Sequence, residues 1–320
     1  MSEFNLIQHY FTRPAKNTDL GVGDDAALIQ IQAGQQLAIS ADMLVAGTHF
    51  FENCPAFDIG WKSLAVNISD MAAMGATPKW ATLAIALPQE NEDWLSEFSH
   101  GFFACADEFN VSLIGGDTTR GPLNISVQIM GEVPIGQALQ RNGAQANDEV
   151  WVSGTLGLAA LGLASLQNKL ASLTSEEKTE CIRALQRPQA RVALGLALRG
   201  IANSAIDISD GLVADLGHIL KQSKVGATLY WEDIPKFKTQ NTIDLDILQQ
   251  ATLAGGDDYE LCFTASASAH DQVLEIGKQL NIPLTCIGFT QKEHGLHVLD
   301  SAQQALEIRS AGYDHFKEHA

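Results

Sequence analysis

Most of the chain alternates between two hydrophobic periods, and this alternation constrains the fold more than any other feature of the sequence. The apolar runs at 37–41 and 80–87 have the length and composition of β-strands. Segments 58–74 and 91–109 instead repeat their apolar residues at the spacing of amphipathic helices. Strands and helices that alternate in this way predict a mixed α/β (α+β) fold, with helices packed on sheets. The length of 320 residues is sufficient for two domains, each with its own core.

A polar stretch, RNGAQAND at 141–148, predicts the boundary between these domains. We expect an N-terminal domain over 1–145 and a C-terminal α/β domain over 146–320. Pro188 suits the first turn of a helix that we expect to end at Ala202. The same patterns predict further strands at 111–116, 123–129, 149–154, 204–209, 227–231, 259–264 and 284–289, and further helices that end near 168, begin near 211, and span 244–252 and 270–281.

Charge and composition exclude several classes of protein. The chain carries 38 acidic and 20 basic residues, a net charge of −18, which argues against nucleic-acid binding because such proteins neutralise phosphates with Lys and Arg. The start, MSEFNLIQHYF, lacks the features of a signal peptide, and the apolar runs are too short to cross a bilayer. The five cysteines are scattered and form no CxxC motif, as is typical of free thiols. We therefore expect a cytoplasmic protein without membrane or nucleic-acid partners.

Aspartates recur at the ends of apolar segments, and this recurrence is the main functional signal. A single such Asp commonly caps a helix or occupies a turn, and that interpretation stays open for Asp210, which precedes Gly211. Asp70 differs, because it lies within a helical pattern one turn after Asn67, where no cap is needed. The six segments are GDDAAL (23–28), ISADML (39–44), NISDMAAMG (67–75), IGGDTTRG (114–121), IDISDGL (206–212) and AGGDDYEL (254–261).

Carboxylates at the strand ends of α/β sheets tend to meet in the crevice where ligands bind. There they would repel one another unless cations neutralised them, and oxygen ligands without His or Cys clusters favour Mg²⁺ over zinc. Mg²⁺ commonly bridges protein carboxylates and substrate phosphates. The adjacent Asp24 and Asp25 are then explained by a site where metal and phosphate meet.

Other phosphate sites fit the sequence less well. The chain has no GxxxxGK[ST] motif and neither the HRD nor the DFG motif of protein kinases. GVGDDA matches the loose GxGxxA fingerprint of dinucleotide-binding folds, but no strand precedes it and no helix follows it.

The six motifs in order closely resemble the thiamine-monophosphate kinases, part of an ATP-dependent superfamily that includes aminoimidazole ribonucleotide synthetase. The resemblance extends from about Phe4 to AGYDHF at 311–316. It implies a homodimer in which the N-terminal sheets pair into a β-barrel, with a C-terminal α/β domain on each chain. It also implies transfer of the γ-phosphoryl group of ATP to thiamine monophosphate, assisted by several Mg²⁺ ions.

The resemblance also assigns roles to particular residues. Asp42, Asp70 and Asp210 would be catalytic, and Gly116, Asp117, Arg141 and Ser209 would contact ATP. His49, Asp257 and Tyr313 would contact thiamine monophosphate. The implied metal ligands are Asp25, Ser40, Ala41, Asp42, Asp70, Asp117, Asp207 and Asp210.

Two positions depart from the family pattern. Ala41 stands where Thr is common, so it can offer only its backbone carbonyl, and Asp257 stands where the longer Glu is common. From the residues alone, Arg141 could equally be a solvated linker residue, His49 an ordinary histidine and Tyr313 a packing residue. Two other functions stay open: the purine-synthesis reaction of the superfamily, and Mg²⁺-nucleotide binding without turnover.

Overall fold

The computed structural model describes residues 3–308 and Gly312. The chain divides into two compact units. The first takes in Met1–Met71 and Ala76–Ala138, and the second Ala72–Gly75 and Leu139–Ala320. Each unit contains one β-sheet. No helix of the described residues has the length and apolar character needed to span a membrane.

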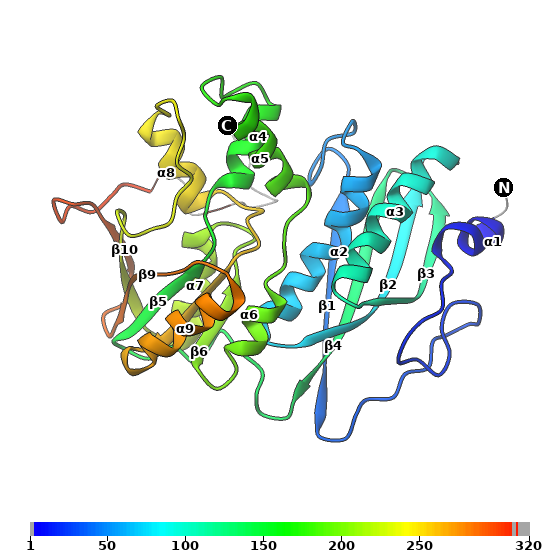
Figure 1. Cartoon of the computed structure of the whole chain (residues 1–320), viewed down its shortest axis with the longest axis horizontal. Helices are drawn as coiled ribbons and strands as arrows, with labels where there is room; N and C mark the ends of the chain where they lie inside the picture. The colour runs from blue at the N-terminus through cyan, green and yellow to red at the C-terminus, as the bar shows by residue number, and fades with distance from the viewer. Residues whose placement is uncertain (1–2, 309–311, 313–320) are drawn as a thin grey trace. The chain divides into compact units, whose positions relative to one another are not determined.

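The first unit is built on a four-stranded sheet of order β1-β4-β2-β3, in which β2 and β3 are parallel and the other neighbours antiparallel. Two helices, α2 and α3, lie along one face of this sheet (Figure 1). A Cβ on Gly60 of α2 would lie 2.1 Å from the Phe98 carbonyl oxygen of α3, so glycine permits the close helix crossing. The elements are α1 (Glu3–Leu6), a π-helical turn (Ile7–Phe11), β1 (Gln35–Val45), α2 (Ala56–Ala73), β2 (Thr77–Leu87), α3 (Glu92–Glu108), β3 (Ser112–Arg120) and β4 (Asn124–Pro134).

The two faces of this sheet differ in what covers them. On the helix-covered face the inner strands β2 and β4 carry buried apolar side chains, among them Leu83, Ile85 and Val127. On the other face, residues of 15–31 pack against Trp80, Ile114 and Met130. The edge strand β1 presents an apolar row on that same face, with Ile39 56% and Met43 54% exposed; the full row, called here the β1 stripe, is Leu37, Ile39, Ala41 and Met43.

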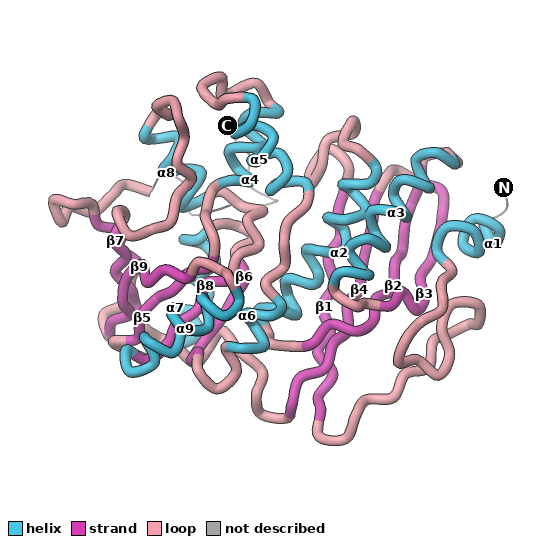
Figure 2. Tube along the Cα trace, viewed as in Figure 1, coloured by secondary structure: helices cyan, strands magenta, loops and turns pink. Residues whose placement is uncertain are grey.

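The second unit contains a six-stranded sheet of order β10-β7-β9-β5-β8-β6, antiparallel except for the β10–β7 pair. Figure 2 shows its strands and the helices around them. Successive residues of β5 face two different cores: Val150 and Val152 pack with α7, and Trp151 packs with α9. The elements are β5 (Asp148–Ser153), α4 (Leu158–Leu166), α5 (Ser175–Gln186), α6 (Val192–Ala197), β6 (Ala202–Asp207), α7 (Leu212–Ser223), β7 (Gly226–Tyr230), α8 (Leu245–Ala254), β8 (Leu261–Ser266), a 3₁₀ turn (Ala267–Ala269), α9 (His270–Leu280), β9 (Leu284–Gln291) and β10 (Leu296–Leu299).

The mixed α/β class predicted from the sequence is confirmed, whereas the domain limits 1–145 and 146–320 stay a prediction. The predicted helix from Pro188 to Ala202 is wrong, because α6 comprises only Val192–Ala197. Arg191, directly before α6, reaches out to the Glu260 carboxylate, and after α6 the chain turns at Gly200, which has φ = +72°.

Candidate active site

Three predicted metal ligands lie together in the first unit, where β1 passes α2. The Ser40 hydroxyl donates a 2.6 Å hydrogen bond to Oδ2 of Asp70. The backbone N–H of Asp42 donates to the Asn67 side-chain oxygen at 3.1 Å, and Asn67 itself is fully buried. Asn67 and Asp70 are one helical turn apart on α2, so they share the face that meets β1. Ser40, Asp42 and Asp70 therefore form a set of oxygen atoms that could bind a metal ion, held in place by these hydrogen bonds.

His49 follows β1 in a tight turn that fixes its ring. The Val45 N–H donates to Nδ1 of His49 at 3.0 Å, and the His49 N–H returns to the Val45 carbonyl. Because Nδ1 accepts a hydrogen bond, the proton of the neutral ring sits on Nε2. His49 therefore offers an N–H donor, four residues after the end of β1.

Asp117 lies elsewhere on the same sheet. The strand predicted to end in a glycine turn at 116 continues to Arg120, so Asp117 sits inside β3 with an exposed side chain. In the sheet register, Asp117 aligns with Ala84, Ser126 and Met43, whereas Asp42 aligns with Val127, Leu83 and Gly116. Aligned residues share a face, so Asp117 and Asp42 project from opposite faces.

They also occupy opposite edges of the sheet, because β1 and β3 are its outer strands. Three strand spacings separate these edges, about 14 Å. Within one chain the structure therefore does not bring Asp117 to Ser40, Asp42 and Asp70.

The other predicted ligands of the first unit are exposed. Asp24 and Asp25 lie in a surface loop, where Oδ1 of Asp24 accepts the Asp25 N–H at 2.9 Å. Ala41 belongs to the β1 stripe, so its side chain points away from the face that carries Asp42. Gly116 has φ = +154°, and a Cβ there would lie 1.8 Å from the Leu83 carbonyl oxygen.

In the second unit, predicted site residues cluster between β6 and α7. Asp207 ends β6 and is buried, and Ser209 and Asp210 follow it in a short loop. Asp215 lies beneath this loop, and its Oδ2 accepts the backbone N–H groups of Ser209, Asp210 and Gly211. Burial, together with the Asp207 and Asp210 carboxylates, raises the pKa of Asp215 to about 7, although the N–H bonds oppose the shift.

A second loop, 255–260, is hydrogen-bonded to the first. The Ser209 carbonyl accepts the Asp257 N–H, and the Ile208 carbonyl accepts the Tyr259 N–H, both at 2.8 Å. The Tyr259 hydroxyl donates to Oδ1 of Asp257 at 3.2 Å. Asp257 and Tyr259 have φ = +68° and +50°, the left-handed region that non-glycine residues rarely adopt. Such local strain is common at functional sites and is maintained here by the paired loops.

Two other acidic residues of this loop have structural roles that the sequence did not reveal. Asp258 accepts the N–H groups of Gly157 and Ala159 at the start of α4, and burial raises its pKa well above the usual range. Glu260 is ion-paired with Arg191 and accepts a hydrogen bond from Ser153. Sequence patterns do not reveal these contacts, because the partners of both Asp258 and Glu260 lie 69–107 residues away in the chain.

Arg141 and Tyr313 complete the predicted set. The carbonyl of Arg141 accepts a hydrogen bond from the Ser223 hydroxyl, at the last residue of α7, and its side chain is exposed. Ser209 and Asp210 precede the opposite end of α7, about 17 Å away along the helix, so Arg141 is not part of their cluster. Tyr313 lies outside the described residues. Its neighbour Gly312 packs close to the loop, since a Cβ there would lie 2.8 Å from the Asp210 carbonyl oxygen.

The predicted metal ligands that lie together thus form two small groups, one around Asp70 in the first unit and one around Asp207 and Asp210 in the second. Among residues 3–308 and Gly312, three or more Asp, Glu, His or Cys side chains do not converge on a ready-made metal site. The donors present are carboxylate, hydroxyl and carbonyl oxygens, the chemistry that Mg²⁺ prefers.

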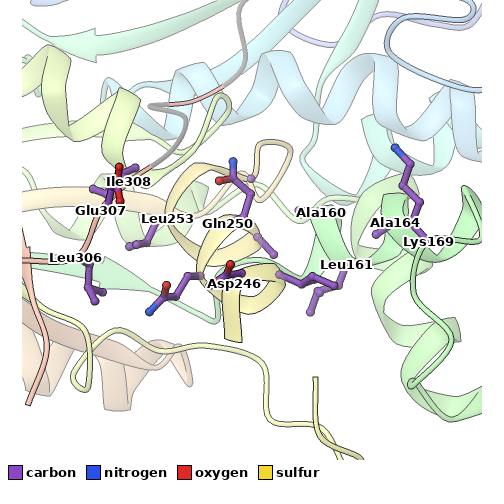
Figure 3. A pocket seen from close by; sticks show the side chains of 14 residues that line it. Ala160, Leu161, Ala164, Lys169, Asp246, Gln250, Leu253, Leu306, Glu307 and Ile308 are labelled. Carbon is purple, nitrogen blue, oxygen red and sulfur yellow. The ribbon is translucent and has the colours of Figure 1, made fainter. Parts of the chain in front are cut away.

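A cavity of about 640 Å³ in the second unit is separate from these sets. Figure 3 shows residues of α8 in the middle, with α4 residues on one side and Leu306, Glu307 and Ile308 on the other. Its walls are mainly apolar, and the lining residue nearest in sequence to the predicted site is Gly255, two residues before Asp257. Its two acidic lining residues, Asp246 and Glu307, belong to none of the six motifs, so this cavity is not the predicted phosphate-metal site.

Comparison with known proteins identifies the family. Residues 23–133 match the family model "AIR synthase related protein, N-terminal domain", and residues 145–301 match the corresponding C-terminal domain. A thiamine-monophosphate kinase of Salmonella typhimurium is 44% identical, with 98% of each chain covered. The crystal structure of a thiamine-monophosphate kinase from Stenotrophomonas maltophilia is 46% identical, with a TM-score of 0.84 and coverage of 95% of this chain and 96% of that one.

A further structure is described as AaThiL complexed with AMPPCP and TMP. It is 28% identical to this chain, with a TM-score of 0.75, and the match covers 92% of each chain. The chain therefore belongs to the AIR synthase related proteins and, within them, to the thiamine-monophosphate kinase family.

Proposed function

We propose that this chain transfers the γ-phosphoryl group of ATP to the phosphate of thiamine monophosphate. The observation that carries the proposal is the 44% identity to a thiamine-monophosphate kinase over 98% of both chains. AMPPCP is an ATP analogue, and its presence with TMP in the AaThiL complex supports ATP and thiamine monophosphate as the two ligands. The reaction forms a bond from an acceptor phosphate oxygen to the γ-phosphorus and breaks the bond from that phosphorus to the β–γ bridging oxygen, which leaves with ADP.

The residues present suit a reaction without a general base. The acceptor is a phosphate monoester with a second pKa of about 6, so its attacking oxygen is already anionic at neutral pH. The main obstacle is repulsion between two polyanions, and bound Mg²⁺ would neutralise and align them. We propose that Ser40, Asp42 and Asp70 hold metal in the first unit, and Asp207 and Asp210 in the second.

The remaining roles follow from the groups that each residue presents. The Nε2–H of His49 would donate to a phosphate oxygen of thiamine monophosphate, a charge-assisted bond. Ser209 and Gly116 would contact ATP, and Asp257 would contact the substrate from its strained loop. We keep Asp25, the Ala41 carbonyl, Arg141 and Tyr313 as proposed ligands on the resemblance alone.

We propose a homodimer in which a second copy covers the β1 stripe and supplies Asp117. Two features support this. The stripe is an exposed apolar row on an edge strand, which is unfavourable in water and favours association. Asp117 also lies on that open face, too far from Asp42 to act with it in the same chain. Pairing of two such sheets into a barrel would remove the exposed edges.

We also propose a cytoplasmic location, supported by five cysteines that are all free.

An assay with purified protein tests the function. Mg²⁺, ATP and thiamine monophosphate should yield thiamine diphosphate and ADP, and chelation with EDTA should abolish the reaction. Formylglycinamidine ribonucleotide serves as the competing substrate, since its turnover would favour the purine-synthesis reaction. Mg²⁺-dependent ATP binding without any product would instead favour a nucleotide-binding protein and contradict the proposal.

A further inference from the structure

The carboxylate of Asp215 holds the loop that carries Ser209 and Asp210, although Asp215 lies outside the six aspartate motifs. Asp215 lies in the first turn of α7 and is only 3% exposed. Its Oδ2 atom accepts three backbone N–H groups, from Ser209 at 3.0 Å, Asp210 at 3.0 Å and Gly211 at 3.1 Å. Because all three donors converge on a single oxygen, the position of that oxygen fixes the direction of three consecutive peptide groups.

The sequence around α7 explains why this carboxylate is needed. The first N–H groups of a helix have no partners within the helix and are commonly satisfied by the side chain of the N-cap residue. Here the N-cap is Gly211, with φ = +117° and no side chain to offer. Asp215, four residues later, instead reaches back to the N–H of Gly211 itself and to those of the two residues before it, much as the acidic residue of a capping box bonds the N-cap N–H.

The loop is also bonded on its other side. The carbonyls of Ile208 and Ser209 accept N–H groups from the 255–260 loop. With its N–H groups bound to Asp215 and its carbonyls bound to the second loop, the backbone at 208–211 has little conformational freedom. The side chains of Ser209 and Asp210 project from this held backbone.

We propose that Asp215 is a positioning residue for phosphoryl transfer, holding Ser209 and Asp210 in the orientation needed for ATP and metal. This inference rests on the proposed function. Asp215 hydrogen-bonds only the backbone of these residues, so it acts through them. A carboxylate suits the task better than an amide, because either of its oxygens can accept the N–H groups, whereas the amide of Asn also carries an NH₂ group that cannot accept them.

Glu177 provides a matched control. It is 7% exposed and also accepts backbone N–H groups, from Thr174 at 2.8 Å and Gln240 at 2.6 Å. Neither partner is a predicted site residue. A substitution of Glu177 therefore removes the same kind of buried capping bond without touching the loop at 208–211.

The first experiment compares amide hydrogen exchange in the metal-free, full-length protein. Asp215→Asn is expected to speed exchange of the amides at 209–211, whereas Glu177→Gln should leave them at the wild-type rate. Unchanged exchange at 209–211 in Asp215→Asn would overturn the proposal, whether or not the protein is an active kinase.

The second experiment measures steady-state kinetics. Asp215→Asn should lower kcat/KM for ATP by about 10- to 100-fold, the usual cost of losing a group that orients a ligand. It should also raise the Mg²⁺ concentration needed for half-maximal rate, while KM for thiamine monophosphate changes little. Asp215→Glu, which keeps the charge but displaces it, should fall between Asp215→Asn and wild type.

The outcomes separate the two hypotheses. If wild type is active and Asp215→Asn matches Glu177→Gln in all kinetic constants, the positioning role is wrong and the function stands. If wild type makes no thiamine diphosphate, the function is wrong, and calorimetric affinity for Mg²⁺-ATP replaces kcat/KM as the second readout. If Asp215→Asn does not fold, both comparisons are made with Asp215→Glu.

Discussion

At the scale of single residues, the hydrogen bonds of His49 limit what it can do. Its Nδ1 is occupied by the Val45 N–H, so only Nε2 can face a ligand, and it can only donate there while the ring is neutral. This geometry fits the proposed role of His49 as a hydrogen-bond donor to a phosphate oxygen and does not fit a general base. The two ring nitrogens therefore have different roles, which can be tested separately. Nδ1 holds the turn through the Val45 N–H, and Nε2 is the nitrogen proposed to contact the substrate.

His49→Asn should retain the first role and lose the second, because the Asn side-chain oxygen can accept the Val45 N–H. A hydrogen bond to a charged group contributes about 1.5–3 kcal/mol, so KM for thiamine monophosphate should rise at least about 10-fold. The midpoint of thermal unfolding should stay close to wild type, whereas His49→Ala should lower both affinity and stability. A wild-type KM in His49→Asn would exclude the proposed contact.

At the scale of elements, the packing of β3 against β2 depends on Gly116. A Cβ at this position would lie 1.8 Å from the Leu83 carbonyl oxygen, a distance that requires the strands to separate. Gly115, one residue earlier on the same strand, serves as the control. A Cβ there has room, because its nearest neighbour would be a Thr82 methyl group at 3.9 Å.

Gly116→Ala should therefore reduce the free energy of unfolding by about 3 kcal/mol, the upper range for inserting one methyl into a packed site. Gly115→Ala should change it by less than about 0.5 kcal/mol. Urea denaturation of both variants measures the difference. Equal stabilities would mean that the packing of β3 against β2 does not depend on a glycine at 116.

The elements also mark the limit of prediction from sequence. Periodicity located α2, α3, α7 and α9 because each buries one face against a sheet. It missed α5, whose mean hydropathy is low and whose start depends on the Thr174–Glu177 capping box. Periodicity also predicted that this strand ends at the glycines. In the structure β3 continues, with Asp117 and Thr119 exposed and Thr118 buried between them, but all three residues are polar, so the sequence shows no apolar alternation there.

The candidate site shows the same limit. The motifs located Asp42, Asp70, Asp207 and Asp210 because local residue types carry that signal. Asp258 and Glu260 stand in one of the same motifs, yet their partners are Gly157 and Arg191, which only the tertiary fold brings near. Hydrogen bonds between distant segments have no periodicity, so sequence patterns do not reveal them.

At the scale of the whole molecule, the position of Asp117 makes the proposed site dependent on a second copy. Asp42 and Asp117 project from opposite faces at opposite edges of the sheet, so they can serve one metal site only if they come from two chains. In a twofold dimer, each site would then take Asp42 from one chain and Asp117 from the other.

Mixed dimers test this directly. Asp42→Asn and Asp117→Asn should each be nearly inactive alone. A dimer that combines one chain of each kind, purified through two different affinity tags, would have one site with both substitutions and one with neither. It should recover about half of the wild-type activity per dimer, as twofold symmetry requires. If both residues acted within one chain, each site of the mixed dimer would carry a substitution and no activity would return. Controls that pair each variant with itself, under the same two tags, should stay inactive.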